Sequence, residues 1–119
     1  MPPAPTSKLQ VEVIEGVTVV LINEPSIVDD ATLNAVRDEL YKLVEATKPQ
    51  KLVLNLSKVR KFSTEFLSNL VGLNSRVKKV GGVLKISNMA PDLLVAVEII
   101  RLPRIIDFFN EEQEAIDSF

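Results

Sequence analysis

Two short apolar runs on either side of a helix-like segment constrain the fold of this chain more than any other feature. The runs, at residues 51–56 and 83–87, have the length and composition of buried strands. Between them, residues 64–80 place apolar side chains at helical spacing, and Gly81 and Gly82 then end the helix. A strand, a helix and a second strand in this order predict two parallel strands joined by a right-handed crossover.

The first part of the chain predicts a pair of strands that run antiparallel. Residues 9–22 begin with alternating apolar and polar side chains and continue as a β-branched run. Glu15 and Gly16 interrupt this segment, which is typical of a hairpin turn. The hairpin makes the predicted sheet a mixed one.

A helix is expected between the hairpin and the strand at residues 51–56. Asp29 or Asp30 can cap its start, and Pro49 ends it, with Lys48 already outside the helical region. Its apolar side chains lie three, four, three and one residues apart and share one face: Leu33, Val36, Leu40, Leu43 and Val44.

The third predicted helix, residues 91–102, begins at Pro91 and is broken by Pro103. It is apolar on nearly every side. A helix of this kind is typically buried, here between the sheet and a neighbouring helix. The alternative is an exposed patch that binds a partner or a second copy of the chain. The apolar run at residues 104–109 fits either an edge strand or a docking strip.

Residues 110–119 predict a last helix, capped by Asn110, with Glu111 and Glu112 at its positive end. The whole order indicates an α/β fold with a four- or five-stranded mixed sheet and helices packed mainly on one face. Residues 1–8 are expected to form a flexible, Pro-rich tail and residues 9–119 a single domain. The predicted core includes side chains from three of these elements: Leu52, Leu54, Leu67, Leu70, Val71, Leu84 and Ile86.

The composition argues against several classes of function. The 119 residues are 46% hydrophobic and 25% charged, and the net charge of −2 without a basic block argues against nucleic-acid binding. The absence of His and Cys removes the commonest general base and metal ligand, so we expect no catalytic site, metal or cofactor. No apolar run is long enough to span a bilayer and the N-terminus lacks a signal-peptide pattern, which favours a cytoplasmic protein without a membrane partner.

Two adjacent hydroxyls begin the second predicted helix, and capping rules explain the first of them, Ser63. As the N-cap residue, its oxygen can accept a hydrogen bond from the backbone N–H of Glu65 or Phe66. Phe62 and Leu67 then have the spacing of a hydrophobic staple. The next hydroxyl, that of Thr64, is not needed for this cap, so Thr64 is either an ordinary surface residue or a functional one.

The stretch "LVLNLSKVRKFSTEFLSNLVGLNSRVKKVGGVLKISN" resembles the STAS domain of bacterial anti-sigma factor antagonists. A strand, a short loop, a helix, a Gly-Gly turn and the next strand follow one another in the family as they do here, without a gap. The segment "VDDATLNAVRDEL" resembles the loop and first helix of the family, and "FFNEEQEAIDSF" resembles its closing helix. The resemblance covers residues 9–119.

The resemblance implies a phosphorylation site at the start of the second helix. The family motif there is Asp-Ser-Ser/Thr-Gly-Leu, and a partner kinase phosphorylates its first Ser. Counted back from Gly81, that Ser corresponds to Thr64, with Ser63 as the second choice of acceptor. Three other motif positions differ here: Ser63 stands in place of the Asp, Glu65 in place of the second hydroxyl residue, and Phe66 in place of the Gly. Leu67 matches the Leu of the motif. The partner-binding residues implied come from two segments: Val28, Asp29, Phe62, Ser63, Thr64 and Glu65.

The function that the resemblance implies is regulatory and not enzymatic. The unphosphorylated protein binds an anti-sigma factor that is also a serine-threonine kinase, and thereby frees a sigma factor; ATP and Mg²⁺ belong to the kinase. The altered motif keeps a second hypothesis open, a non-switching scaffold or an accessory subunit of a signalling or lipid-transport complex. A homodimer also stays open. An enzyme is the third hypothesis, for which the sequence offers no catalytic constellation.

Overall fold

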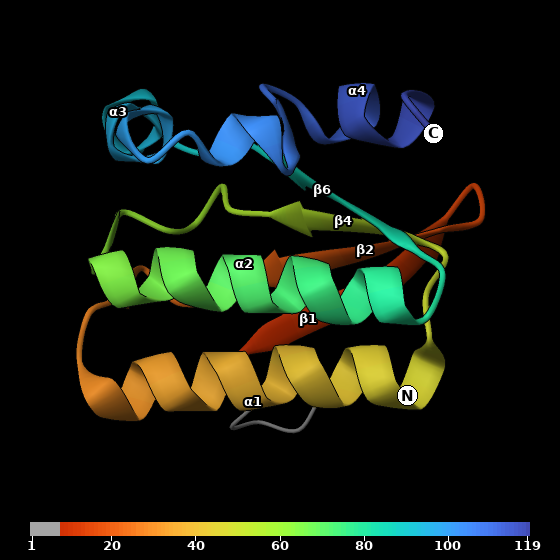
Figure 1. The fold of residues 1–119 in the computed structure, drawn as a ribbon, viewed down its shortest axis with the longest axis horizontal. Coiled ribbons are helices and arrows are strands. Elements are labelled where there is room, and N and C mark those ends of the chain that lie inside the picture. Colours follow the sequence, from red (N-terminus) through yellow and green to blue (C-terminus); the bar gives the residue numbers. More distant parts are fainter. Residues whose placement is uncertain (1–7) are drawn as a thin grey trace.

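A five-stranded mixed sheet forms the centre of the computed structural model, which describes residues 8–119. Residues 1–7 of the predicted tail therefore lie outside the described range. The sheet has the order β1-β2-β4-β6-β7: β1 (Leu9–Ile14), β2 (Val17–Ile22), β4 (Lys51–Asn55), β6 (Val83–Ser87) and β7 (Asp107–Phe109). β1 and β2 are antiparallel, and all other neighbours are parallel (Figure 1). This confirms the predicted α/β class and the mixed sheet.

The turn between β1 and β2 needs two residues with positive φ. Glu15 has φ 53° and Gly16 has φ 78°, the left-handed pair that a two-residue hairpin turn uses. The hairpin therefore turns where the sequence predicts.

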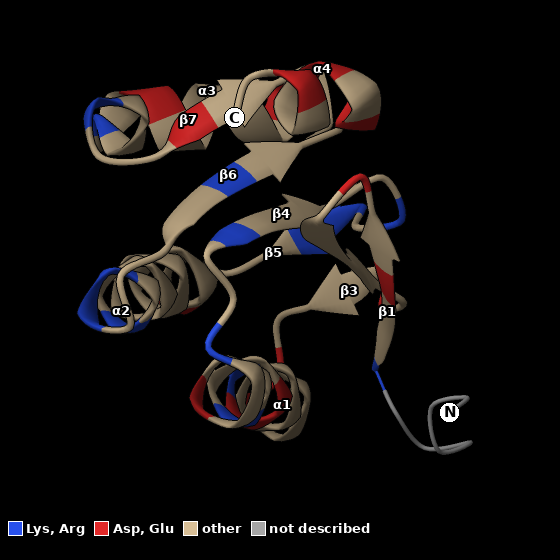
Figure 2. Ribbon diagram, turned by 90° about the vertical axis from the view of Figure 1, so that its right-hand side faces the viewer, with Lys and Arg blue, Asp and Glu red and all other residues tan. Residues whose placement is uncertain are grey.

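The two long helices, α1 (Asp30–Thr47) and α2 (Thr64–Lys79), lie side by side on one face of the sheet (Figure 1). α1 ends at Lys48, which adopts φ 45° before Pro49, as expected. α2 ends with Gly81 at φ 83°, and the N–H of Gly82 bonds to the carbonyl of Val77 at 2.9 Å. The last turn of α2 carries Arg76, Lys78 and Lys79, whose positive charge is favourable at a helix C-terminus. Figure 2 colours basic residues blue, and blue segments mark the α2 ribbon.

The core between these helices and the sheet agrees with the sequence at all predicted positions except one. Buried as predicted are Leu52, Leu54, Leu67, Leu70, Leu84 and Ile86. Val71 is 41% exposed, so its prediction as a core residue is wrong. The buried stripe of α2 instead passes through Phe66, Leu70, Leu73 and Val77, whose spacings of four, three and four keep one helical face.

A shorter helix, α4 (Glu112–Asp117), covers the other face of the sheet over a smaller cluster that contains Val17, Val19, Val53, Ala115 and Ile116. It starts later than predicted, and Asn110 is not its cap. Glu111 occupies the N-cap position, and its N–H bonds to the carboxylate of Glu114 at 3.1 Å. This capping box between Glu111 and Glu114 places the N-cap one residue beyond the predicted Asn110.

The third helix, α3 (Pro91–Ile99), is shorter than predicted. The chain leaves it at Arg101, which has φ 60°, and a 3₁₀ turn (Leu102–Arg104) follows. The left-handed backbone of Arg101 cannot continue a right-handed helix, so α3 ends before Pro103 is reached. After this turn comes β7, so the expectation of an edge strand within residues 104–109 is confirmed.

The expectation that the third helix is buried on all sides is wrong. Val97 is its one fully buried side chain within the described part of the chain. Val95 and Ile99, by contrast, are 56% and 75% exposed. Leu93 and Leu94 are partly buried against the core beside Val97, so the core covers only one side of α3.

Candidate partner-binding site

Two very short strands bring the candidate site residues together. β3 (Ser26–Ile27) and β5 (Lys61–Phe62) pair in parallel, with Ile27 opposite Phe62. No sequence pattern predicts them, because strands of two residues have no measurable periodicity. A further main-chain hydrogen bond joins the two segments, from the N–H of Ser63, directly after β5, to the carbonyl of Ile27 in β3, at 3.1 Å. The segments that follow β3 and β5 therefore leave side by side, and they lead into the N-terminal ends of α1 and α2 (Figure 1).

Asp29 is held in place as the N-cap of α1. Its two carboxylate oxygens accept hydrogen bonds from the backbone N–H of Thr32 at 2.9 Å and from the hydroxyl of Thr32 at 2.8 Å. The hydrogen bond from the Thr32 backbone, followed by that from its side chain, lowers the pKa of the Asp29 carboxyl below its usual value. Val28, directly before it, is 45% exposed. Of the two caps that the sequence allowed, Asp29 is the one used.

Ser63 has the backbone of an N-cap but not its side-chain bond. Its φ of −89° and ψ of 166° fit the cap position of α2, yet the side chain makes no capping hydrogen bond. Instead, its Oγ atom is buried and has no hydrogen-bond partner among residues 8–119. The prediction that this oxygen caps Glu65 or Phe66 is therefore wrong. One reason why the Ser63 hydroxyl does not cap Phe66 is that the N–H of Phe66 bonds instead to the backbone carbonyl of Ser63, at 3.1 Å.

Thr64 and Glu65 are both exposed in the first turn of α2. The next residue, Phe66, is 1% exposed, and its ring packs 5.4 Å from that of Phe62 at an interplanar angle of 34°. Sequence reasoning paired Phe62 with Leu67 and missed this aromatic pair. The helical spacing from Phe66 to Leu70 was the signal that could have found it.

The described residues contain neither a candidate metal site nor a candidate membrane span. Within residues 8–119, no group of three acidic side chains could hold a metal ion, and no helix is both long and apolar enough to cross a bilayer. A hollow of about 490 Å³ lies away from the α2 start, between α3 and β7, and Leu94, Pro103 and Phe108 contribute to its lining.

Comparisons with known proteins agree on one family. The sequence model of the STAS domain matches residues 8–115. No curated protein matches the chain. An anti-sigma factor antagonist from Mycobacterium paratuberculosis has a similar structure, with a TM-score of 0.81, 24% identity, and 97% of this chain and 96% of that chain covered.

Two further solved structures show how widely this fold is used. The phosphorylated form of the Bacillus cell fate determinant SpoIIAA has a TM-score of 0.68 and 16% identity, with 92% and 97% of the two chains covered. A sulfate transporter family protein from Wolinella succinogenes has a TM-score of 0.73 and 18% identity, with 90% and 87% covered. The match of the family model over nearly the whole chain, together with this shared fold, shows that the chain belongs to the STAS domain family and resembles its anti-sigma factor antagonists.

Proposed function

We propose that this protein is a non-enzymatic binding module of the anti-sigma factor antagonist type, switched by phosphorylation of Thr64. In the unphosphorylated form it binds an anti-sigma factor with serine-threonine kinase activity, in the cytoplasm, and thereby frees a sigma factor. The observation that carries the proposal is the position of Thr64. Its exposed side chain begins α2 next to the Val28–Asp29 segment, and within residues 8–119 its hydroxyl has no hydrogen-bond partner.

Burial favours Thr64 over Ser63 as the acceptor. A kinase must bring the γ-phosphate of ATP to the hydroxyl oxygen, and the Oγ atom of Ser63 is buried in the folded protein. Thr64 is exposed one residue later. In the transfer, the Thr64 Oγ1–phosphorus bond forms, the bond from phosphorus to the leaving ADP oxygen breaks, and the hydroxyl proton passes to a base of the kinase.

The phosphate is expected to alter binding more than folding. It adds about −1.5 to −2 charges at a helix N-terminus, where the helix dipole favours negative charge. A partner that covers this surface must instead remove water from the new charge, which is unfavourable unless the partner supplies a counter-charge. Glu65 already places one carboxylate next to Thr64, so the unmodified surface is not free of negative charge.

The proposal is tested by incubating the purified chain with ATP, Mg²⁺ and each anti-sigma kinase encoded in the same genome. Mass spectrometry then counts and locates the phosphate. We expect one phosphate on the wild type and on Ser63→Ala, and none on Thr64→Ala. Equal phosphorylation of Thr64→Ala and the wild type would overturn the assignment of the acceptor.

A second candidate function rests on the altered motif. Ser63, Glu65 and Phe66 depart from the family's Asp, second hydroxyl and Gly, and Phe66 is locked into the core. A STAS domain that never switches, as a scaffold or as an accessory subunit of a signalling or transport complex, fits this departure. This candidate predicts that no kinase of the same genome phosphorylates the chain.

A further inference from the structure

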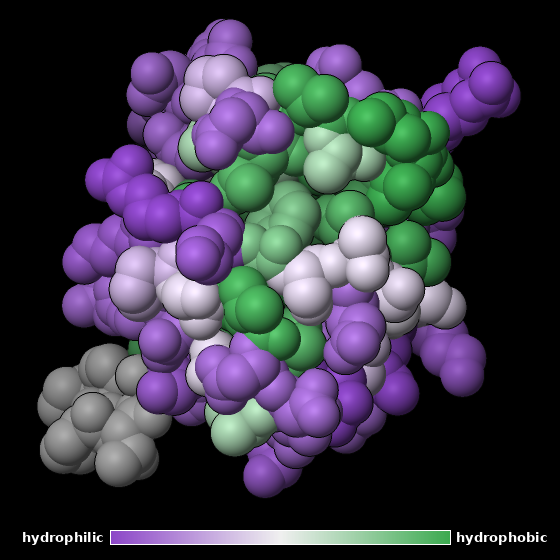
Figure 3. Space-filling view, turned by 90° about the vertical axis from the view of Figure 1, so that its left-hand side faces the viewer, coloured by the Kyte–Doolittle hydropathy of each residue, from purple (hydrophilic) through white to green (hydrophobic). Residues whose placement is uncertain are grey.

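The exposed side of α3 carries the molecule's most conspicuous apolar surface on the face seen in Figure 3. The α3 patch consists of Val95 (56% exposed), Ile99 (75%), Ile100 (50%) and Ile105 (51%). Figure 3 shows hydrophobic surface gathered along the edge of the molecule where this helix lies. The opposite side of the helix packs on the core through Val97. A helix that is apolar all round but covered on one side only is typical of an interaction surface.

Unpaired charges of opposite sign lie at the two ends of the α3 patch. Asp92 is exposed in the first turn of α3, whereas Arg101 and Arg104 follow its last turn. None of these three side chains forms an ion pair with another of residues 8–119. Asp92 therefore precedes the two apolar residues Val95 and Ile99, and Arg101 follows them. Glu98, which is also exposed, lies between Val95 and Ile99.

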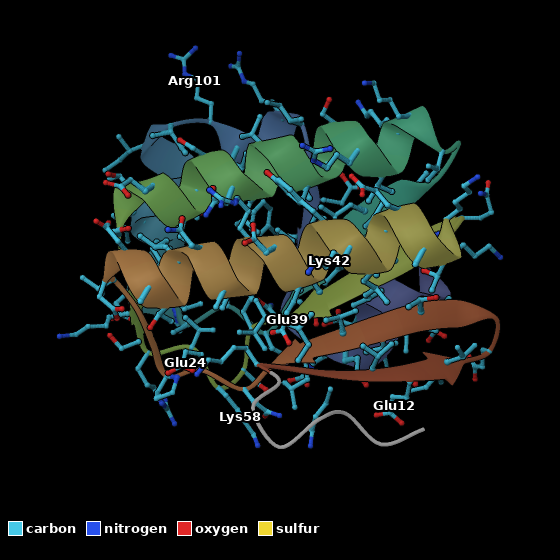
Figure 4. All side chains as sticks on the ribbon, turned by 90° about the horizontal axis from the view of Figure 1, so that it is seen from below. Glu12, Glu24, Glu39, Lys42, Lys58 and Arg101 are labelled. Atoms are coloured by element: carbon cyan, nitrogen blue, oxygen red, sulfur yellow. The ribbon has the colours of Figure 1, made fainter. Side chains whose placement is uncertain are left out.

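Arg101 occupies a backbone position that glycine adopts more easily. Its φ of 60° follows directly after the helix, where a left-handed residue is commonly Gly because other side chains are strained there. Figure 4 shows the Arg101 side chain extending away from the body of the protein. The charge at this end of the α3 patch is thus exposed to solvent by a residue whose backbone conformation is strained.

We propose that the α3 patch binds a second copy of this chain, with the two α3 helices antiparallel about a two-fold axis. This orientation places Val95 opposite the partner's Ile99, and it brings Asp92 of each copy toward the partner's Arg101. A parallel pairing would instead bring like charges together at both ends. The charges at the two ends of the patch are complementary only in the antiparallel orientation, which is the orientation of a closed two-fold interface.

The interface is expected to be weak. The exposed area of four such side chains is a few hundred Å² per copy, whereas standard stable complexes bury about 800 Å² per partner. The dimer should therefore dissociate on dilution. It is also independent of the Thr64 switch, so Thr64→Asp should dimerise like the wild type.

Sedimentation of the purified full chain from about 1 µM to about 1 mM tests the proposal over the range of weak affinities. The wild type should pass from monomer to dimer. Ile99→Glu should stay monomeric at the highest concentration, with an unchanged melting temperature because its side chain is 75% exposed. Val13→Glu is the matched control, since Val13 is 70% exposed on β1, at the opposite edge of the sheet. It should dimerise like the wild type.

A charge exchange tests the orientation. Asp92→Arg and Arg101→Asp should each weaken self-association at least tenfold, because each brings like charges together. An equimolar mixture of the two variants should recover dimerisation as a heterodimer, since every 92–101 contact across the antiparallel interface is then attractive again. Both variants are checked for folding by thermal melts.

Three results would overturn the proposal. If the wild type is monomeric at every concentration, the proposed dimer does not form. If Ile99→Glu dimerises like the wild type, the dimer forms through another surface. A mixture that fails to recover association excludes the antiparallel pairing. If the monomeric wild type but not Ile99→Glu sediments with vesicles of anionic phospholipid, the α3 patch is a membrane contact.

Discussion

The backbone N–H of Ser63 donates a hydrogen bond to the carbonyl oxygen of Ile27, 3.1 Å away. Together with the pairing of Ile27 and Phe62, this bond fixes the Val28–Asp29 segment next to Thr64 through main-chain contacts. The position of Thr64 relative to this segment thus depends on main-chain bonds and not on the Thr64 side chain. Substitutions at Thr64 should therefore report on binding and not on folding.

Thr64→Asp is expected to weaken the complex with the anti-sigma partner while leaving the melting temperature nearly unchanged. A carboxylate in the first turn of α2 is mildly favourable for the helix, but an unpaired charge desolvated in an interface costs several kcal/mol. Titration calorimetry measures the affinity, and Ser75→Asp, at an exposed position in the last turns of α2, is the control that should bind normally. Equal affinity of Thr64→Asp and the wild type would favour the non-switching scaffold.

Ser63→Ala is expected to change the free energy of unfolding by less than about 0.5 kcal/mol. The substitution removes a buried oxygen that has no hydrogen-bond partner among the described residues, so no cap is lost. Urea unfolding compares it with Asp29→Ala, which removes two hydrogen bonds to Thr32 and should be clearly less stable than the wild type. A loss of about 1 kcal/mol for Ser63→Ala would show that its hydroxyl does cap α2 in solution.

Asp29→Asn is expected to reduce the dependence of stability on acid pH. Because folding lowers the pKa of Asp29, its carboxylate stabilises the folded state above the unfolded-state pKa of about 3.9. This contribution is lost as the pH falls through the lower pKa of the folded state. Asn can still cap the helix but carries no charge. Melting temperatures from pH 7 down to about pH 2.5 should therefore fall more steeply for the wild type, and parallel curves would contradict this role.

Leu70→Ala and Val71→Ala, adjacent residues of α2, should differ strongly in stability. Leu70 is fully buried, so its truncation should cost about 2–5 kcal/mol. Val71 is 41% exposed, and its truncation should stay within about 0.5 kcal/mol. Urea unfolding measures both. Similar losses for the two variants would mean that α2 is rotated relative to the sheet.

Local signals in the sequence determined the order of the longer helices and strands and most of their ends. Asp29 before α1, the lysine before Pro49, and Gly81 after α2 act on their own backbone and on immediate neighbours, so their effect is readable without the fold. The apolar periods of the long helices and strands are equally local. At Asn110 and Glu111 two local signals competed, and the sequence predicted the wrong cap residue.

The tertiary structure alone decided three features on which function depends. The pairing of β3 with β5 joins segments that are distant in sequence, and two-residue strands leave no pattern to predict it. The burial of the Ser63 oxygen depends on what packs around the start of α2, which capping preferences do not describe. The exposure of Val95 and Ile99 depends on how far the sheet and its layers extend beneath α3. A sequence specifies how apolar a side chain is, but only the packed layers determine whether another part of the molecule covers it.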